Sequence, residues 1–169
     1  MRQTLSFSEK LGEILFPSLR ERRARLERAL DDDRLTGMAN RAAFEKACAT
    51  AEADREILFI VLDLNNFGLV NKTLGHAFGD EILWAIASEI KRACFAYKAR
   101  SFRYGGDEFV VLAGECFADA LRDSIERRVG KFEFDNFTVS ISGTTGKTFA
   151  EADAALQKRK KRMKGDVQV

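Results

Sequence analysis

The sequence predicts an α+β fold in which helices flank a mostly antiparallel sheet. Residues 57–62 form a continuous apolar run, which is typical of a strand buried on both faces at the centre of a sheet. Apolar runs on either side of the Gly105-Gly106 pair predict a β-hairpin. The intervening segments space their apolar residues as helices do. The resulting order of strand, two helices, hairpin, helix, strand and helix is an α+β pattern.

The composition indicates one domain with a short extension. The chain has 169 residues, of which 46% are hydrophobic, and its formal charge of +2 gives no overall reason to expect binding to nucleic acid. No apolar run approaches the roughly 20 residues of a membrane span, and the N-terminus lacks a signal-peptide core. Cys48, Cys94 and Cys116 are odd in number and far apart, which predicts buried reduced thiols and a cytoplasmic protein.

The N-terminal region predicts an amphipathic helix over residues 18–32. Pro17 suits the first turn of such a helix, whose apolar side carries Leu15, Leu19, Leu26 and Leu30. Two interpretations stay open, because this side can pack on its own domain or pair with a partner chain. Binding of nucleic acid is disfavoured, since Glu21 and Glu27 interrupt the basic face.

The remaining elements follow from apolar spacing and from the turn residues between them. The Asp31-Asp32-Asp33 run is typical of a solvated turn. Gly75 breaks a short helix within residues 65–74, and residues 76–80 predict a second turn. The other predicted elements are helices over 41–53, 81–97, 117–129 and 149–164, strands over 56–64, 100–104 and 108–113, and a strand or hairpin over 132–142.

Two carboxylates stand at the ends of neighbouring predicted strands. Asp63 follows the central strand and Asp107 lies at the tip of the hairpin, so the two acids converge if those strands pair. Oxygen ligands without histidine suit Mg²⁺ or Mn²⁺, which is what two-metal nucleotidyl transfer requires. Glu108 points to the opposite face in an ideal strand and joins them only if the turn twists. The alternative is that the acids are solvated turn residues.

Other polar residues are candidates for binding a nucleotide. Without side chains, Gly105 and Gly106 let a phosphate or sugar approach the backbone. Asn71 and Asp80 are suited to a purine edge, because a carboxylate accepts both N–H groups of guanine. Lys160 and Lys164 share one helix face that could meet a triphosphate, although their spacing alone favours a solvated basic helix end. The single histidine, His76, is interpreted as a structural hydrogen bonder.

The hairpin Arg103-Tyr104-Gly105-Gly106-Asp107-Glu108-Phe109 resembles the signature of the GGDEF family of diguanylate cyclases. Three further blocks resemble family motifs in the same order: residues 33–41, residues 62–67 with Asn71 and 75–80, and residues 152–156. The resemblance covers about residues 33–164. It divides the chain into a helical extension, 1–32, for signalling or dimerisation, and a GGDEF domain, 33–169.

The resemblance implies a palm-like fold, of the ferredoxin-like nucleotidyl cyclase type, that condenses two GTP into cyclic di-GMP and two pyrophosphates. It implies these roles: metal ligation by Asp63, Asp107 and the carbonyl of Leu64; deprotonation of the 3′-hydroxyl by Glu108; guanine binding by Asn71 and Asp80; phosphate contacts by the backbone of Phe67 and Gly68; and triphosphate contacts by Lys160 and Lys164, with Lys160 counted among the catalytic residues. Because each domain binds one GTP, catalysis requires a homodimer, with Gly105 and Gly106 where the two meet. The N-terminal helix could also receive a regulatory partner.

Several residues depart from the family pattern. Gly68 stands where a lysine is usual, Asn65 and Lys72 where aspartates are usual, and Ser142 where a glycine is usual. Gln157 and Arg159 replace a usual tyrosine and alanine in the last helix. These departures motivate an alternative, a catalytically weak or inactive module that binds GTP or another protein. A cyclase that makes a different cyclic dinucleotide is a third possibility.

Overall fold

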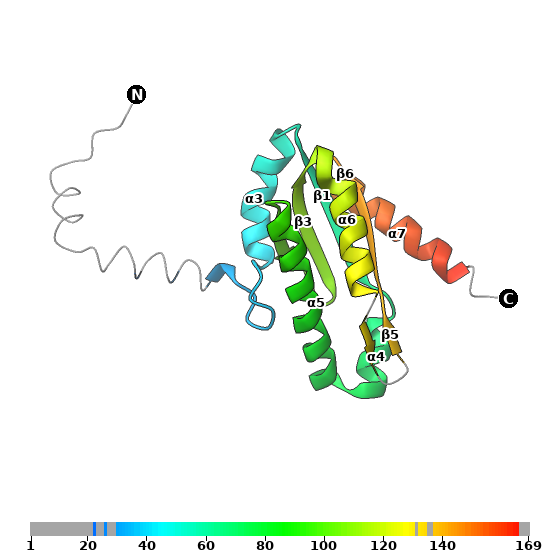
Figure 1. The fold of residues 1–169 in the computed structure, drawn as a ribbon. Coiled ribbons are helices and arrows are strands. Elements are labelled where there is room, and N and C mark those ends of the chain that lie inside the picture. Colours follow the sequence, from blue (N-terminus) through cyan, green and yellow to red (C-terminus); the bar gives the residue numbers. More distant parts are fainter. Residues whose placement is uncertain (1–21, 23–25, 27–29, 131, 135–136, 166–169) are drawn as a thin grey trace, which may run out of the picture.

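The computed structural model describes residues 22, 26, 30–130, 132–134 and 137–165, and a four-stranded antiparallel sheet lies at its centre (Figure 1). The strand order is β2-β3-β1-β6, with bounds β1 Ile57–Leu64, β2 Arg100–Arg103, β3 Glu108–Gly114 and β6 Ile141–Gly146. The apolar run predicted as a central strand is β1, which pairs with β3 on one side and β6 on the other. The predicted α+β fold with an antiparallel sheet is confirmed.

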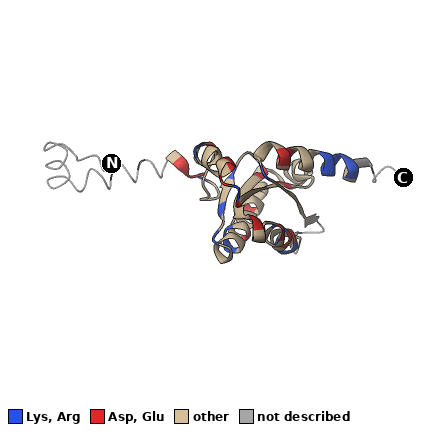
Figure 2. Cartoon of the chain, turned by 90° about the horizontal axis from the view of Figure 1, so that it is seen from above, with Lys and Arg blue, Asp and Glu red and all other residues tan. Residues whose placement is uncertain are grey.

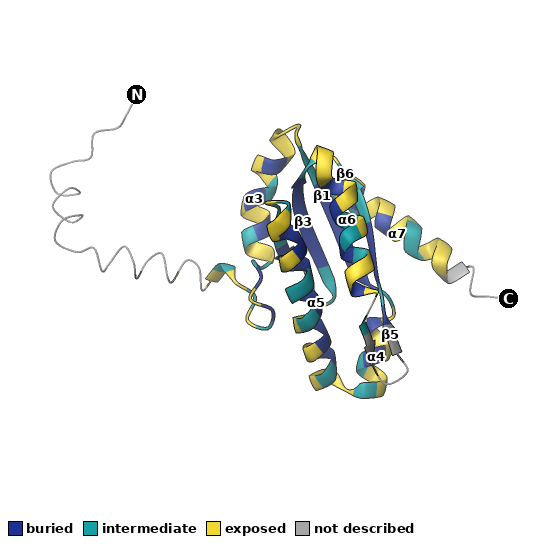
Figure 3. Cartoon of the chain, viewed as in Figure 1, coloured by how far each residue is buried: buried dark blue, intermediate teal, exposed yellow. Residues whose placement is uncertain are grey.

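Helices cover both faces of the sheet, which is why its strands are buried on both sides (Figure 3). One face packs on α5 (His76–Ala96) and α6 (Glu115–Val129). The other packs on α3 (Arg41–Ala53) and α7 (Phe149–Gly165). Along β1, Ile60 and Leu62 belong to the first core, and Phe59 and Val61 to the second. This alternation places every second strand residue on the α3 and α7 face.

The turn predicted over residues 76–80 is wrong, because these residues form the first turn of α5. The short helix α4 (Phe67–Leu74) ends where predicted, and Gly75 alone joins it to α5 with a φ of 86°. Only glycine adopts that conformation readily, so no second turn is needed. Gly79, which suggested a turn in the sequence, lies within α5 against the side chain of Asn71.

The region predicted as one strand or hairpin over 132–142 contains both arrangements. Strands β4 (Phe132–Phe134) and β5 (Phe137–Val139) form a separate two-stranded hairpin, and β6 then enters the main sheet beside β1. Asp63 of β1 lies opposite Ser142 of β6. The strand that follows the small hairpin therefore borders the end of β1 where the predicted acids lie.

The predicted N-terminal helix lies mostly outside the described residues, including Leu15 and Leu19. Residues 30 and 31 are helical, and Asp32 then forms a β-bridge with Ala39. Leu26 and Leu30 are 65% and 72% exposed, so the domain does not cover the apolar side of the helix at these two positions. In the described part of the chain, no helix combines the length and apolar character needed to cross a membrane.

The cysteine prediction is partly confirmed. All three cysteines are free, and Cys94 is buried in α5, where burial raises the pKa of its thiol to about 12. Cys48 is only partly buried, and Cys116 is exposed at the start of α6. The prediction of burial is therefore wrong for Cys116, because an apolar sequence context does not show which side of an amphipathic helix a residue occupies.

Candidate active site

The register between β1 and β3 places Asp63 directly opposite Glu108. Opposed residues of antiparallel strands share a face, so both carboxylates lie on the face that carries α3 and α7. Lys160 of α7 forms an ion pair with Oδ1 of Asp63, whose side chain is only 9% exposed. The sequence-based expectation that Glu108 joins Asp63 only through a twisted turn is wrong, because pairing in register already places them together.

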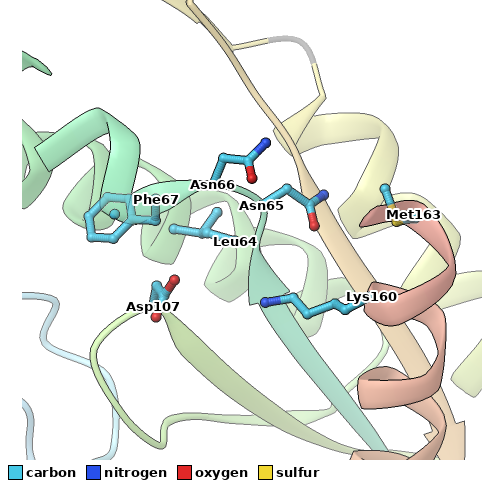
Figure 4. A pocket seen from close by; sticks show the side chains of 8 residues that line it. Leu64, Asn65, Asn66, Phe67, Asp107, Lys160 and Met163 are labelled. Carbon is cyan, nitrogen blue, oxygen red and sulfur yellow. The ribbon is translucent and has the colours of Figure 1, made fainter. Parts of the chain in front are cut away.

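Asp107 lies in the turn just before β3, and its backbone carbonyl accepts a hydrogen bond from the amide of Leu64 at 3.2 Å. Its side chain borders an open hollow of about 430 Å³ at the end of β1 (Figure 4). Lys160 extends from α7 into the same hollow. The lining residues are Leu64, Asn65, Asn66, Phe67, Gly68, Asp107, Lys160 and Met163.

Negative charge is concentrated around Glu108. Partial burial raises the pKa of this carboxyl, and the nearby charges of Asp63, Asp107 and Asp153 raise it further, while Lys160 acts in the opposite direction. A carboxyl with a raised pKa is a stronger proton acceptor than an ordinary glutamate. The same excess of negative charge favours a bound cation.

A second open hollow, of about 500 Å³, adjoins the first and shares three of its lining residues, Phe67, Gly68 and Asp107. The lining residues are Phe67, Gly68, Asn71, His76, Asp80, Leu83, Arg103, Gly106 and Asp107. It therefore brings the two predicted guanine-binding residues, Asn71 and Asp80, next to the hairpin turn. The start of α4 borders both hollows, and the first N–H groups of a helix have no acceptor within that helix.

Arg103 links the hairpin turn to the start of the domain. Its Nε and Nη2 atoms donate to the carbonyl of Gly106 at 3.1 and 2.8 Å, and Nη1 donates to Oδ1 of Asp33 at 2.9 Å. Asp33 also accepts from the amide and the hydroxyl of Thr36, at 2.9 and 2.7 Å. The prediction that Asp31 to Asp33 are merely solvated is therefore wrong for Asp33.

The pKa of Asp33 reflects this network. Partial burial alone raises the pKa of its carboxyl, but hydrogen bonds from Thr36 and the guanidinium of Arg103 outweigh burial, and the pKa falls below its ordinary value of 3.8. The side chains of Arg103 and Asp33 are 13% and 24% exposed. This half-buried ion pair thus holds the turn that precedes Asp107.

The donors at the end of β1 fit a hard divalent cation. Among the described residues, no three His, Cys, Asp or Glu side chains form a group that could hold a metal ion by themselves. Asp63, Asp107 and the carbonyl of Leu64 offer only oxygen donors beside an excess of negative charge. Mg²⁺ is usually bound in this way, through one or two carboxylates together with substrate phosphates.

Comparison with known proteins assigns the fold and the hairpin to a family. A sequence model described as "Diguanylate cyclase, GGDEF domain" matches residues 30–166. The chain belongs to the GGDEF domain family. Its match begins three residues before Asp33, so the partner of Arg103 lies at the N-terminal end of the GGDEF domain.

The GGDEF domain is similar to parts of longer proteins. It is 34% identical over 117 residues to the diguanylate cyclase VdcA of Vibrio cholerae, covering 64% of this chain and 34% of VdcA. It is 38% identical over 112 residues to the cyclic di-GMP phosphodiesterase PdeR of Escherichia coli, covering 63% of this chain and 17% of PdeR. The chain thus spans about a third or less of these relatives.

A solved structure resembles nearly the whole chain. The coiled coil and GGDEF domain of DgcB from Caulobacter crescentus, in complex with c-di-GMP, has a TM-score of 0.77 and 27% sequence identity. The similarity covers 91% of this chain and 92% of that one. It supports the antiparallel sheet and flanking helices described above.

Some predicted site residues of the GGDEF domain lie apart from the two hollows, and others were missed. Gly105 lies against its own Glu108, where an added Cβ would be 2.9 Å from the carboxylate. The side chain of Lys164 is outside the part that the structure describes. Met163 and Asn66 line the first hollow, and Asn66 turns β1 into α4 with a φ of 56°. The adjacent asparagines were the signal for that turn, since asparagine tolerates positive φ.

Proposed function

We propose that this GGDEF domain is a diguanylate cyclase that condenses two GTP into cyclic di-GMP and two pyrophosphates. The observation that carries the proposal is the pair of adjoining hollows, one lined by Asp107 and by Lys160, the ion-pair partner of Asp63, and the other lined by Asn71 and Asp80. A triphosphate and a guanine base need these two chemistries side by side. The activity named for VdcA supports the same assignment.

In this proposal the chain's own residues bind and orient GTP. Asp80 accepts the N–H groups of guanine and Asn71 contacts the same base, while the first N–H groups of α4 face the phosphates. Lys160 balances the negative charge of the triphosphate, and Glu108 accepts the proton of the attacking 3′-hydroxyl. Mg²⁺ or Mn²⁺ bound by Asp63, Asp107 and the carbonyl of Leu64, as two ions, would neutralise phosphate charge and lower the pKa of that hydroxyl.

The reaction joins two nucleotides, so the proposal includes a homodimer with Gly105 and Gly106 near the contact between GTP molecules. Gly106 has open space around it and lines the second hollow, which supports this placement. The helix before Asp33 is proposed to form a separate signalling or dimerisation segment over residues 1–32. Its exposed Leu26 and Leu30 suit a partner helix, and the DgcB structure contains a coiled coil with its GGDEF domain.

The proposal also includes a regulatory partner that binds the N-terminal helix. It places the protein in the cytoplasm. The exposed Leu26 and Leu30 give such a partner an apolar surface. The diguanylate cyclase SiaD of Pseudomonas aeruginosa, in complex with its activator SiaC, has the same fold. That example provides a precedent for a protein partner.

A weak or inactive GTP-binding module is the second candidate. The similarity to PdeR, which is named as a phosphodiesterase, shows that related sequence occurs in a protein named for another activity. Gly68 and Asn65, both in the first hollow, depart from the family pattern. In the proposal these residues lie beside the phosphates and not beside the base. Their departure from the family pattern would therefore change the turnover rate more than the binding of guanine.

Incubation of the purified chain with GTP, ATP and Mg²⁺, followed by separation of the products, tests the proposal. We expect cyclic di-GMP from GTP, with a specific activity that rises with protein concentration because the reaction needs two domains. Binding of GTP without any cyclic product at dimer-forming concentrations would favour the inactive module. An adenine-containing cyclic product would contradict the role of Asp80.

Gly79→Ala is expected to weaken GTP binding while the fold persists. A Cβ atom at Gly79 would overlap the amide oxygen of Asn71, which must then move out of the second hollow. Elsewhere in a helix, alanine in place of glycine stabilises by up to about 1 kcal/mol. We therefore expect at least a roughly tenfold higher Kd for GTP, measured by calorimetry. Gly114→Ala, where an added Cβ meets nothing closer than 3.9 Å, is the control, and equal Kd values for the two variants would disprove the steric role of Gly79.

A further inference from the structure

The C-terminal half of α7, which carries Lys160, has little apolar packing to hold it. The buried side chains of this helix are Ala152 and Leu156, at 0% and 1% exposure. Lys160 lies one turn beyond Leu156, in a stretch of basic residues that Figure 2 shows toward the C-terminus. Met163, further along, is 44% exposed. Apolar burial therefore does not determine where Lys160 points.

Arg159 supplies the missing attachment through polar contacts. Its Nη1 atom donates to Oε1 of Glu126 at 2.7 Å and to the carbonyl of Gly143 at 2.6 Å, and Nη2 lies 3.4 Å from Oε2 of Glu126. The same Oε1 accepts the amide of Gly143 at 2.7 Å. One guanidinium thus joins α7 to α6 and to the backbone of β6.

The attachment lies one residue from the candidate active site. Gly143 is opposite Leu62, and Ser142 is opposite Asp63, the partner of Lys160. The hydroxyl of Ser142 donates to Oδ1 of Asn65 at 3.0 Å. The sulfur of Met163, one helical turn after Arg159 on the same side of α7, lies 3.6 Å from the oxygen of that hydroxyl. Three departures from the family pattern, Asn65, Ser142 and Arg159, therefore lie in neighbouring contacts at this edge of β6.

We propose that Arg159 is a positioning residue, which acts on GTP through Lys160 by fixing the end of α7 over the first hollow. The inference rests on the proposed function, since it concerns how Lys160 meets the triphosphate. A guanidinium can satisfy the carboxylate and the carbonyl together because its N–H groups are held in one plane. The arginine at position 159, where the family usually has alanine, would then support the candidate active site. The sequence alone had counted this departure as a sign of weak activity.

A double-mutant cycle between Arg159 and Lys160 tests the inference. The measured quantity is the Kd for guanosine 5′-(α,β-methylene)triphosphate with Mg²⁺, which binds without turnover. We expect Arg159→Ala to raise this Kd by about threefold to tenfold in the wild-type background. In the Lys160→Ala background the same change should alter it by less than about twofold, because its effect passes through Lys160. Equal losses in both backgrounds would show a general structural role and overturn the inference.

Two further variants keep the test informative if Arg159→Ala folds poorly. Arg159→Lys keeps the charge but loses the planar guanidinium, and Glu126→Gln weakens the same contact from α6, so each should give a smaller loss that also disappears without Lys160. Arg128→Ala is the matched control, because Arg128 pairs with Glu89 at 3.2 Å and has a similar exposure, 43% against 41%. If the wild-type chain binds the analogue but Arg159→Ala has the same Kd as Arg128→Ala, the inference about Arg159 is overturned and the proposed function is not affected. A wild-type chain that does not bind the analogue overturns the proposed function as well.

Discussion

Replacement of Asp63 by asparagine is expected to reduce cyclic di-GMP formation by at least about a thousandfold, the scale of losing a metal-dependent step. Asp63 is 9% exposed at the end of β1, opposite Glu108 and paired with Lys160. Asparagine preserves its shape but removes the charge that would bind a cation and balance Lys160. Product formation and Mn²⁺ binding by calorimetry should therefore fall together. Asp107→Asn is expected to lose activity in the same way.

The control for this prediction is Asp153→Asn. Asp153 of α7 is close enough to raise the pKa of Glu108, so its removal changes the local charge without removing a proposed ligand. We expect this variant to retain most of its turnover and its Mn²⁺ affinity. Substantial activity in Asp63→Asn would mean that the metal site is misplaced.

Arg103→Ala is expected to cost both stability and activity. The change removes two donors to the carbonyl of Gly106 and the partner of Asp33, in a pair with 13% and 24% exposed side chains. Loss of hydrogen bonds to a charged group costs about 2–3 kcal/mol in the free energy of unfolding. The turn would then no longer hold Asp107 in one position, so we expect turnover to fall by more than about tenfold, as small misplacements of catalytic groups do.

Denaturant unfolding and a turnover assay on the same samples measure both effects. Arg100→Ala, on the same strand, is the control, because its guanidinium stacks over the ring of Phe102 at 5.2 Å and does not contact the turn. Its turnover should stay near that of the wild type. Loss of stability in Arg103→Ala with full activity would show that the network does not position Asp107.

The contact between Asp33 and Arg103 also predicts a pH signature. The folded protein lowers the pKa of Asp33 below 3.8, so the ionised carboxylate stabilises the fold above that pH. This stabilisation is lost as the pH falls through the lowered pKa. The gap in unfolding free energy between wild type and Asp33→Asn should therefore be largest near about pH 6 and narrow toward about pH 3. A gap that does not change with pH would contradict the network.

Most helices and strands could be predicted, because each depends on a pattern of residues within its own segment. The apolar run of β1, the glycine pair of the hairpin and the spacing of α3 predicted elements within a few residues of their observed ends. The error over residues 76–80 arises from a contact between α4 and α5, because Gly79 resembles a turn glycine in the sequence but leaves room for the amide of Asn71 in the fold. A close approach between two helices leaves no signal in the pattern of one of them.

The candidate residues were identifiable from the sequence because acids at strand ends and ordered family motifs are features of the chain alone. Their arrangement depended on packing. Only strand register paired Asp63 with Glu108, only the packing of α7 brought Lys160 to Asp63, and only the folded turn joined Arg103 to Asp33. The sequence by itself thus determined the fold class and which side chains are available for chemistry. The tertiary structure decided which of them meet, because contacts between residues 40 to 100 positions apart depend on register and helix docking, which no local pattern contains.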